Sequence, residues 1–357
     1  MPMPFTDMAV RNLLSRFPDP ETGRSIVQLE QVHAIKLSGN KLEITLGLTS
    51  WAAPVKESVC EDLSKHIESA FPDADVEITL ATHERPAEPS GTLGLCAKSV
   101  FAVGAGKGGV GKSSVSAFLA CGLARSGAKV GLLDADVYGP SIPHMFGATD
   151  TPRLMNNRIQ PVEQSGVKLL SMGMLVPAKD AVVWRGPMLH KALTQFVQDT
   201  NWGDLDYLIV DMPPGTGDVA ISLSNLLSVT GAVVVCTPQD VALLDAVKAI
   251  SMFGHVKIPV LGMVENMSFF ICPNCTARHE IFGSGGAKLR AAEMNVPFLG
   301  EIPLTTELRI LADQGRVDAS FDYEPARPYL DSICKTLVGN IVEQRKKHPV
   351  MPKLPLL

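Results

Sequence analysis

Residues 100–114 read VFAVGAGKGGVGKSS, which is the most informative stretch of the chain. The apolar run Val100–Val103 predicts a buried strand, residues 104–112 predict a glycine-rich loop, and Ser113–Arg125 predicts a helix. The glycines of the loop let backbone N–H groups converge on phosphate oxygens, and the N-terminus of the helix adds its dipole. The stretch therefore predicts a phosphate-binding loop.

This loop holds most of the side chains expected at a bound nucleotide. Lys112 is expected to reach the β- and γ-phosphates, and Ser113 is expected to ligate Mg²⁺. Lys107 is a second lysine in the loop, and it is not needed to hold the phosphates of its own subunit. The loop residues predicted to bind the nucleotide are Gly106, Lys107, Gly108, Gly109, Val110, Gly111, Lys112, Ser113 and Ser114.

Around the loop, strand-like and helical patterns alternate over residues 98–345. Because the strand-like runs are apolar throughout and are joined by helices, they predict an α/β domain with a mostly parallel sheet covered by helices on both faces. The predicted strands are Ser99–Val103, Val130–Asp134, Val167–Met172, Tyr207–Asp211, Ala232–Thr237, Pro259–Val264 and Pro297–Leu299.

Residues 1–80 predict a separate small domain. Helical periodicity over Met8–Phe17 and Pro54–Ala70 alternates with β-rich runs, which gives the order α-β-β-α-β. Residues 81–97 contain two prolines and two glycines and predict a linker, and residues 346–357 predict a flexible tail. The strands predicted in the small domain are Ile26–Leu37, Lys41–Leu48 and Asp75–Leu80.

Three aspartates follow strand-like runs of the large domain. Asp134 and Asp136 lie at the end of one run, and Asp211 ends another in the Walker B pattern. Ligands of parallel sheets bind at the carboxyl ends of the strands, so these carboxylates are expected near the phosphates. Asp211 is expected to hold Mg²⁺ directly or through water. Helix capping is the alternative role for Asp134 and Asp136.

Two later segments add candidates for the nucleotide site. The glycine-rich turn of residues 213–218 follows Asp211, so a backbone N–H near Gly215 is expected to sense the γ-phosphate. Asn266 follows a later strand, and a turn-forming asparagine is the alternative to a nucleotide contact there. The chain has no Asn-Lys-x-Asp guanine signature, which favours ATP over GTP.

Cys272 and Cys275 form a single Cys-x-x-Cys pair in a polar stretch. Zinc and iron–sulfur clusters usually take four protein ligands, so one pair is half of a site. A two-fold dimer would bring two such pairs together as one four-thiolate site for Zn²⁺ or a [4Fe–4S] cluster. An incidental pair is the third interpretation. His279 is expected to be a surface histidine, and the other five cysteines are expected to be buried or incidental thiols.

The composition excludes several classes of partner. With 32 basic and 37 acidic residues the chain lacks the basic surplus of a nucleic-acid binder. No apolar run approaches the roughly 18–20 residues of a membrane span. The N-terminus has neither the apolar core of a signal peptide nor the composition of a transit peptide, so a cytoplasmic location is expected.

Five segments together resemble the Mrp/ApbC family of iron–sulfur cluster carrier ATPases, within the MinD/ParA-like class. By this resemblance Lys107 crosses a dimer interface to the partner's nucleotide, where it acts like an arginine finger; a solvated surface lysine is the alternative. Asp136 would orient the attacking water, Asp134 would act near Mg²⁺, and Asn266 would read the adenine edge. The segments are residues 106–113, 134–141, 184–187, 211–218 and 265–275.

The resemblance implies an ATP-hydrolysing homodimer that carries a [4Fe–4S] cluster and transfers it to apoproteins, with scaffold proteins as further partners. The small domain resembles a domain that is also found alone in iron–sulfur assembly. Ala53 stands where standalone versions often have a cysteine, so contact with a client or scaffold is expected there instead.

Three other functions are less consistent with the sequence. A MinD/ParA-like positioning ATPase with a zinc-stapled dimer needs an amphipathic C-terminal helix, and Pro349, Pro352 and Pro355 interrupt that segment. A nitrogenase-reductase-like electron donor uses two separated cysteines per subunit. A zinc-stapled shuttle for membrane proteins needs a large apolar groove, for which the sequence has no methionine-rich helical segment.

Overall fold

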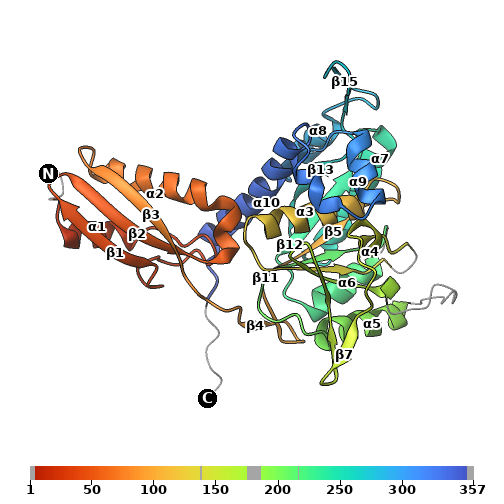
Figure 1. The fold of residues 1–357 in the computed structure, drawn as a ribbon, viewed down its shortest axis with the longest axis horizontal. Helices are drawn as coiled ribbons and strands as arrows, with labels where there is room; N and C mark the ends of the chain where they lie inside the picture. Colours follow the sequence, from red (N-terminus) through yellow and green to blue (C-terminus); the bar gives the residue numbers. More distant parts are fainter. Residues whose placement is uncertain (1–4, 137–138, 175–185, 216, 352–357) are drawn as a thin grey trace. The chain divides into compact units, whose positions relative to one another are not determined.

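The computed structural model describes residues 5–136, 139–174, 186–215 and 217–351 (Figure 1). The chain forms two compact units. One unit comprises Met1–Arg85 together with Val338–Leu357, and the other comprises Pro86–Leu337. Val137, Tyr138, Trp184, Arg185 and Thr216, which belong to the sequence motifs above, lie outside the described residues.

The large unit is built on a sheet of nine strands. Eight of them follow the order β16-β13-β12-β5-β11-β6-β10-β9, and β4 pairs with β5 off this path. All pairings are parallel except β9 with β10 and β4 with β5. The strands are β4 (Pro89–Ser90), β5 (Leu95–Gly104), β6 (Val130–Asp134), β9 (Val162–Gln164), β10 (Val167–Ser171), β11 (Leu205–Asp211), β12 (Gly231–Cys236), β13 (Val260–Glu265) and β16 (Phe298–Glu301).

Helices flank this sheet because its central strands are apolar on both faces. Every residue of β6, β11 and β12 is buried. One hydrophobic cluster joins alternate strand residues such as Leu133 and Val210 to residues of α5–α8, whereas α3 contacts β5, β6, β10 and β11. The predicted α/β class is confirmed. The helices are α3 (Lys112–Arg125), α4 (Ile142–Met145), α5 (Gly186–Gln198), α6 (Gly217–Leu226), α7 (Asp240–His255), α8 (Gly286–Glu293), α9 (Thr306–Asp313) and α10 (Arg327–Lys347).

The small unit has the predicted α-β-β-α-β order. Its sheet follows the order β1-β2-β3, with β1 antiparallel and β3 parallel to β2. Leu42, Ile44 and Leu46 alternate along β2 with less buried residues, so one face of the sheet packs in the core. The elements are α1 (Asp7–Leu14), β1 (Val32–Ser38), β2 (Lys41–Leu48), the short helix η1 (Ser50–Val55), α2 (Lys56–Ala70) and β3 (Asp75–Thr82).

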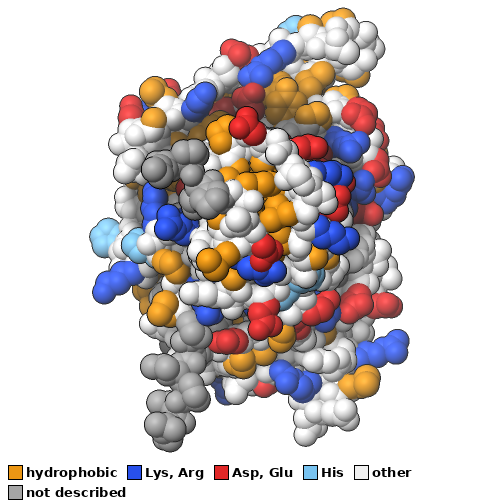
Figure 2. Space-filling view, turned by 90° about the vertical axis from the view of Figure 1, so that its left-hand side faces the viewer, with side chains coloured by type: hydrophobic (Ala, Val, Ile, Leu, Met, Phe, Trp, Pro, Cys, Tyr) orange, Lys and Arg blue, Asp and Glu red, His pale blue; other side chains and the backbone are white. Residues whose placement is uncertain are grey.

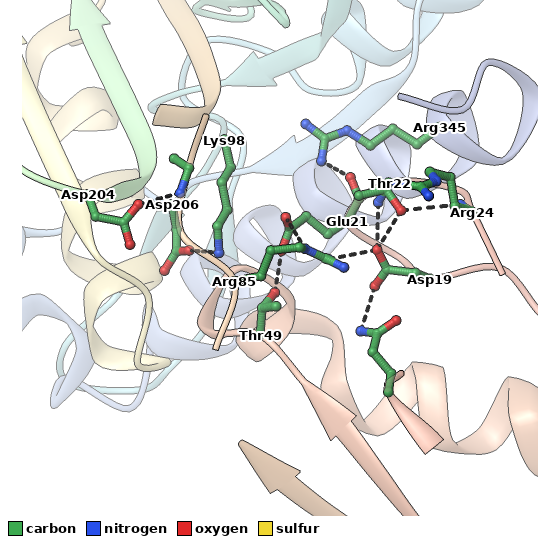
Figure 3. A network of polar contacts seen from close by, with 12 residues as sticks. Asp19, Glu21, Thr22, Arg24, Thr49, Arg85, Lys98, Asp204, Asp206 and Arg345 are labelled. Carbon is green, nitrogen blue, oxygen red and sulfur yellow. Dashed lines mark hydrogen bonds and ion pairs between the residues drawn. The ribbon is translucent and has the colours of Figure 1, made fainter. Parts of the chain in front are cut away.

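The C-terminal half of α10 belongs to the small unit through Arg345. This side chain is 8% exposed, donates a hydrogen bond to the carbonyl oxygen of Glu21, and lies with its guanidinium 4.7 Å from the ring centroid of Trp51. Glu21 and Asp19 also accept hydrogen bonds from Arg85, at 3.0 and 2.8 Å (Figure 3). The domain end expected at 345 therefore differs from the structure, since the large unit ends at Leu337.

Several predicted boundaries differ from the structure. The expected linker contains strand residues, because Pro89 and Ser90 of β4 pair with Cys96 and Leu95 of β5. The expected tail begins inside α10, which ends at Lys347. The first strand begins at Val32 rather than Ile26. A further hairpin, of β7 (Arg153–Met155) and β8 (Arg158–Gln160), was not predicted.

Two features of the structure concern membranes and nucleic acids as partners. None of the described helices combines the length and the apolarity needed to cross a membrane. On the face drawn in Figure 2, basic and acidic side chains are interspersed among the described residues instead of gathering in one basic patch.

Candidate nucleotide site and cysteine hairpin

The phosphate-binding loop connects the end of β5 to the start of α3, as the sequence predicts. Two of its glycines are required by the geometry. Gly111 has φ +79°, and a Cβ there would lie 2.1 Å from Nδ2 of Asn266. A Cβ at Gly106 would lie 2.0 Å from the backbone oxygen of Asp245. The loop is therefore tightly packed at both ends, which fixes its path around a phosphate.

Asp211 is the centre of the polar contacts beneath this loop. Its Oδ2 lies 2.7 Å from Nζ of Lys112 and accepts a 2.6 Å hydrogen bond from the Ser113 hydroxyl. Its Oδ1 accepts a 2.6 Å hydrogen bond from the Ser116 hydroxyl. Lys112, Ser113 and Asp211 are the residues that the motifs predict here, whereas Ser116 was not predicted. The helical spacing was the available indication, because Ser116 lies one turn after Ser113 on the same face of α3.

Asp134 lies on the strand next to Asp211 and is also fully buried. It accepts a 3.0 Å hydrogen bond from the Ser171 hydroxyl and a 3.1 Å bond from the N–H of Asp136. Burial, together with the negative charge of Asp211, raises the pKa of Asp134 to about 7. Two buried carboxylates beside a serine hydroxyl are an oxygen-rich donor set that suits Mg²⁺. Ser171 was not predicted, although its register opposite Asp134 places it there.

Asp136 lies at the wall of the same site. Its Oδ1 accepts a 3.3 Å hydrogen bond from the N–H of Gly139, and the residue is 8% exposed. The next helix, α4, has Ser141 at its N-cap, so neither Asp134 nor Asp136 caps it. The helix-capping alternative therefore has no support at α4.

A cavity of about 890 Å³ lies over the loop. This volume is in the range of small-molecule sites. Its polar wall includes Asp136, Asn266 and the loop residues Lys107, Gly108, Gly109, Gly111, Lys112, Ser113 and Ser114, and its apolar wall includes Phe118, Met145, Pro303, Leu304 and Leu308.

Lys107 and Asn266 line this cavity, whereas Gly215 is not among the described residues of its wall. Lys107 is half-buried, and within the part of the chain that the structure describes it has no carboxylate partner. The N–H of Gly215 donates a 3.3 Å hydrogen bond to the carbonyl oxygen of Ala105, just before the loop. Asn266 donates from Nδ2 to the carbonyl oxygen of Val110 at 2.9 Å and is also part of the cavity wall.

The paired cysteines lie on a short hairpin near α8. In Figure 1 this hairpin, labelled at β15, projects from the large unit. Its strands are β14 (Phe270–Ile271) and β15 (Arg278–His279), and the N–H of Cys272 donates to the carbonyl oxygen of Ala277 at 3.0 Å. Cys272 is half-buried and Cys275 is exposed. Hydrogen bonds from the backbone N–H of Cys275, from that of Asn274 and from the Cys275 thiol lower the pKa of Cys272. This favours the thiolate, which is the metal-binding form.

No third ligand accompanies this pair within the described residues. They contain no cluster of three or more His, Cys, Asp or Glu side chains suited to a metal ion. His279 is exposed, as predicted. Burial raises the pKa of Cys121, Cys236 and Cys334, which are buried thiols as expected. Cys60 and Cys96 are half-buried.

Comparison with known proteins identifies the family. A family model described as the NUBPL iron-transfer P-loop NTPase matches residues 96–338. The chain belongs to this family. A second model, described as an iron–sulfur cluster assembly protein, matches residues 7–80. The resemblance drawn from the sequence motifs is thereby confirmed.

Curated relatives and solved structures agree with this assignment. The chain is 46% identical over 336 residues to an iron–sulfur cluster carrier protein of Deinococcus radiodurans, covering 93% of this chain and 95% of that protein. It is 43% identical over 312 residues to the Escherichia coli K12 carrier, covering 86% and 84%.

Among solved structures, an Archaeoglobus fulgidus nucleotide-binding protein in complex with ADP, with cobalt found by PIXE, is 40% identical. That match covers 62% of this chain and 88% of the other, with a TM-score of 0.56. An Aquifex aeolicus MinC:MinD cell division complex is 19% identical, covers 72% and 98%, and has a TM-score of 0.51. This last likeness shows the fold alone.

Proposed function

We propose that this chain is an ATP-hydrolysing iron–sulfur cluster carrier that works as a homodimer. ATP and Mg²⁺ bind at the loop of residues 106–114, and a [4Fe–4S] cluster is held by Cys272 and Cys275 of two copies. The cluster then passes to apo iron–sulfur proteins, with scaffold proteins as further partners. One observation carries this proposal: Cys272 and Cys275 lie together on a projecting hairpin without a third ligand among the described residues.

The nucleotide part of the proposal is supported by the contacts at Asp211. Lys112, Ser113 and Asp211 lie within 3.2 Å of one another, so a phosphate and a metal ion would find their ligands already assembled. Ser113 and Asp211, with Asp134 behind them, are the residues that would hold Mg²⁺. When bound, the ion would neutralise the charge of the phosphates. Asp136 is assigned to orient the attacking water from the cavity wall, and the Gly215 N–H is assigned to sense the γ-phosphate.

The dimer part of the proposal is supported by Lys107. Lys107 lines the cavity and its ammonium group has no carboxylate partner among the described residues, so its charge is available to a phosphate of a second subunit. A cation delivered in trans stabilises charge that develops during phosphoryl transfer. A two-fold arrangement that exchanges Lys107 also offers two thiols from each subunit to one cluster.

The related proteins support the proposals that the chain binds a nucleotide and carries an iron–sulfur cluster. The Archaeoglobus protein was solved with ADP, and both curated relatives described above are cluster carriers. We assign ATP recognition at the base to Asn266, which lines the cavity. We assign client or scaffold contact to the small unit, where Ala53 replaces the cysteine of standalone domains. The zinc-stapled positioning ATPase has only the fold-level likeness to MinD in its favour.

Anaerobic reconstitution with iron and sulfide tests this proposal. The full-length chain is expected to take up about two iron atoms per subunit, as one shared [4Fe–4S] cluster requires, with oxygen-labile visible absorbance and a [4Fe–4S] Mössbauer signature. Cys272→Ala and Cys275→Ala are each expected to lose this uptake, whereas Cys60→Ala keeps it. Binding of zinc only would contradict the carrier function and favour the zinc-stapled alternative.

A further inference from the structure

The base of the cysteine hairpin forms part of the nucleotide cavity. Phe270, two residues before Cys272, lines the cavity together with Ile281, which follows the hairpin on its other side. Phe270 also forms a strand bridge with Leu304, another cavity residue. The hairpin, whose connecting loop carries the two thiols, is therefore flanked on both sides by residues of the pocket that would enclose a nucleotide.

Glu265 holds both ends of the segment that contains this hairpin. Its buried carboxylate accepts a 2.5 Å hydrogen bond from the Ser268 hydroxyl on the incoming side and a 2.8 Å bond from the N–H of Ala287 on the outgoing side. The neighbouring Asn266 donates to Val110 in the phosphate-binding loop. The phosphate-binding loop and the residues at the base of the hairpin are thus connected through the adjacent residues Glu265 and Asn266.

Arg278 ties the hairpin itself to this base. Its guanidinium donates to both carboxylate oxygens of Glu301, at 2.9 and 3.3 Å, and lies 3.7 Å from the ring centroid of Phe269. Glu301 is in turn 3.1 Å from the Ser268 hydroxyl. A hydroxyl has one proton, so Ser268 donates to one of these two carboxylates at a time. The two-point contact of an arginine with a carboxylate fixes orientation as well as distance.

We propose that Arg278 is a positioning residue that couples the nucleotide cavity to the thiols of Cys272 and Cys275 through Glu301, Ser268 and Glu265. Nucleotide binding moves the cavity wall, and Arg278 makes the hairpin follow this movement. The accessibility of the two thiols then depends on the nucleotide. The role in cluster release rests on the proposed function, whereas the coupling itself is a property of the protein without a cluster.

Thiol alkylation in the cluster-free protein tests the coupling directly. The full-length chain, freed of metal by a chelator under anaerobic conditions, is alkylated with iodoacetamide in the presence of Mg²⁺ and either ADP, a non-hydrolysable ATP analogue or no nucleotide. Mass spectrometry then gives the rates at Cys272 and Cys275 separately. We expect the nucleotide to change at least one rate by about fivefold or more, the lower range of typical coupling between sites. In Arg278→Ala this ratio falls to about one.

A matched control separates positioning from a general loss of structure. Arg290→Ala removes an arginine of the same 42% side-chain exposure that is paired with Glu293 on α8, and it should leave the nucleotide response unchanged. Arg278→Lys keeps the charge without the two-point contact and should retain part of the response. Glu301→Gln should match Arg278→Ala, with no further loss in the double variant. Binding of a fluorescent ATP analogue by each variant checks that the nucleotide site is intact.

The outcomes distinguish this inference from the proposed function. Wild-type thiols that do not respond to nucleotide, or a full response in Arg278→Ala, would overturn the coupling. Failure of the wild-type chain to take up a cluster, with the alkylation response present, would contradict the carrier function and leave the coupling supported.

Discussion

The contact between Ser116 and Asp211 tests how the carboxylate that we assign to Mg²⁺ is held in place. The Ser116 hydroxyl donates to Oδ1 of the fully buried Asp211 at 2.6 Å and lies 3.2 Å from the carbonyl oxygen of Lys112. Ser113 and Lys112 are expected to contact the metal ion and phosphates, whereas Ser116 lies a turn farther into α3. Its expected role is to hold Asp211 in the orientation that Mg²⁺ requires.

The substitution Ser116→Ala removes a hydrogen bond to a buried charged group. Such a bond contributes about 1.5–3 kcal/mol, and each 1.4 kcal/mol corresponds to about tenfold in an equilibrium constant. The Mg²⁺ concentration that half-saturates ATP hydrolysis is therefore expected to rise about 10- to 100-fold. The affinity for ATP without metal should change little, because Ser116 is not part of the cavity wall.

Magnesium titrations of ATP hydrolysis, with metal-free nucleotide binding measured in parallel, provide the assay. Ser251→Ala is the control, because that serine donates to a carbonyl oxygen of its own helix α7 at 3.0 Å, away from the loop. A half-saturating Mg²⁺ concentration in folded Ser116→Ala within about twofold of wild type would refute the reasoning. Asp211 would then be oriented by Ser113 and Lys112 alone.

Three further predictions follow from the same geometry. Lys107→Ala should lower ATP turnover about 10³-fold or more while sparing most ATP binding; unchanged turnover would exclude a lysine acting in trans. Asp134, whose pKa is raised to about 7, makes the metal-free protein lose stability as the pH rises from about 4 to 7, because only the folded state then holds the proton. Urea unfolding at several pH values should show that Asp134→Asn removes this slope, and an equal slope in both proteins would contradict the assignment. Arg345→Met should destabilise the small unit by about 2–4 kcal/mol. Amide hydrogen exchange in β2 and α2 should then be faster than in a Lys347→Met control, and equal exchange rates in the two variants would contradict this role of Arg345.

The fold was largely predictable because its determinants are local. Strands β6 and β11 are apolar throughout, so their place in a covered parallel sheet could be inferred without knowing their neighbours. The linker was predicted less well, because the pairing of Pro89 and Ser90 with β5 depends on partners and not on composition. The C-terminal half of α10 was assigned to the large domain, since nothing local shows that Arg345 packs against Trp51.

The residues of the candidate site also fall into a group that the sequence predicted and a group that it did not. Lys112, Ser113, Asp211 and the pair Cys272 and Cys275 were predicted because each belongs to a short motif whose spacing carries its chemistry. Ser171, Glu301 and Arg278 were not, because their partners lie on other segments of the chain. The contacts of these three residues depend on which strands lie side by side and in which register, and a single sequence does not show this.

Sequence patterns alone predict a phosphate-binding loop between a strand and a helix, carboxylates at the ends of strands, and one pair of thiols. Each of these follows from backbone freedom, hydrophobic periodicity or residue spacing within a few turns of chain. Only the tertiary structure brought Asp211 to Ser113 across 98 positions and mounted the thiol hairpin on the wall of the nucleotide cavity. Such contacts arise from packing between distant segments, so the proximity of the thiol hairpin to the cavity exists only in the folded chain.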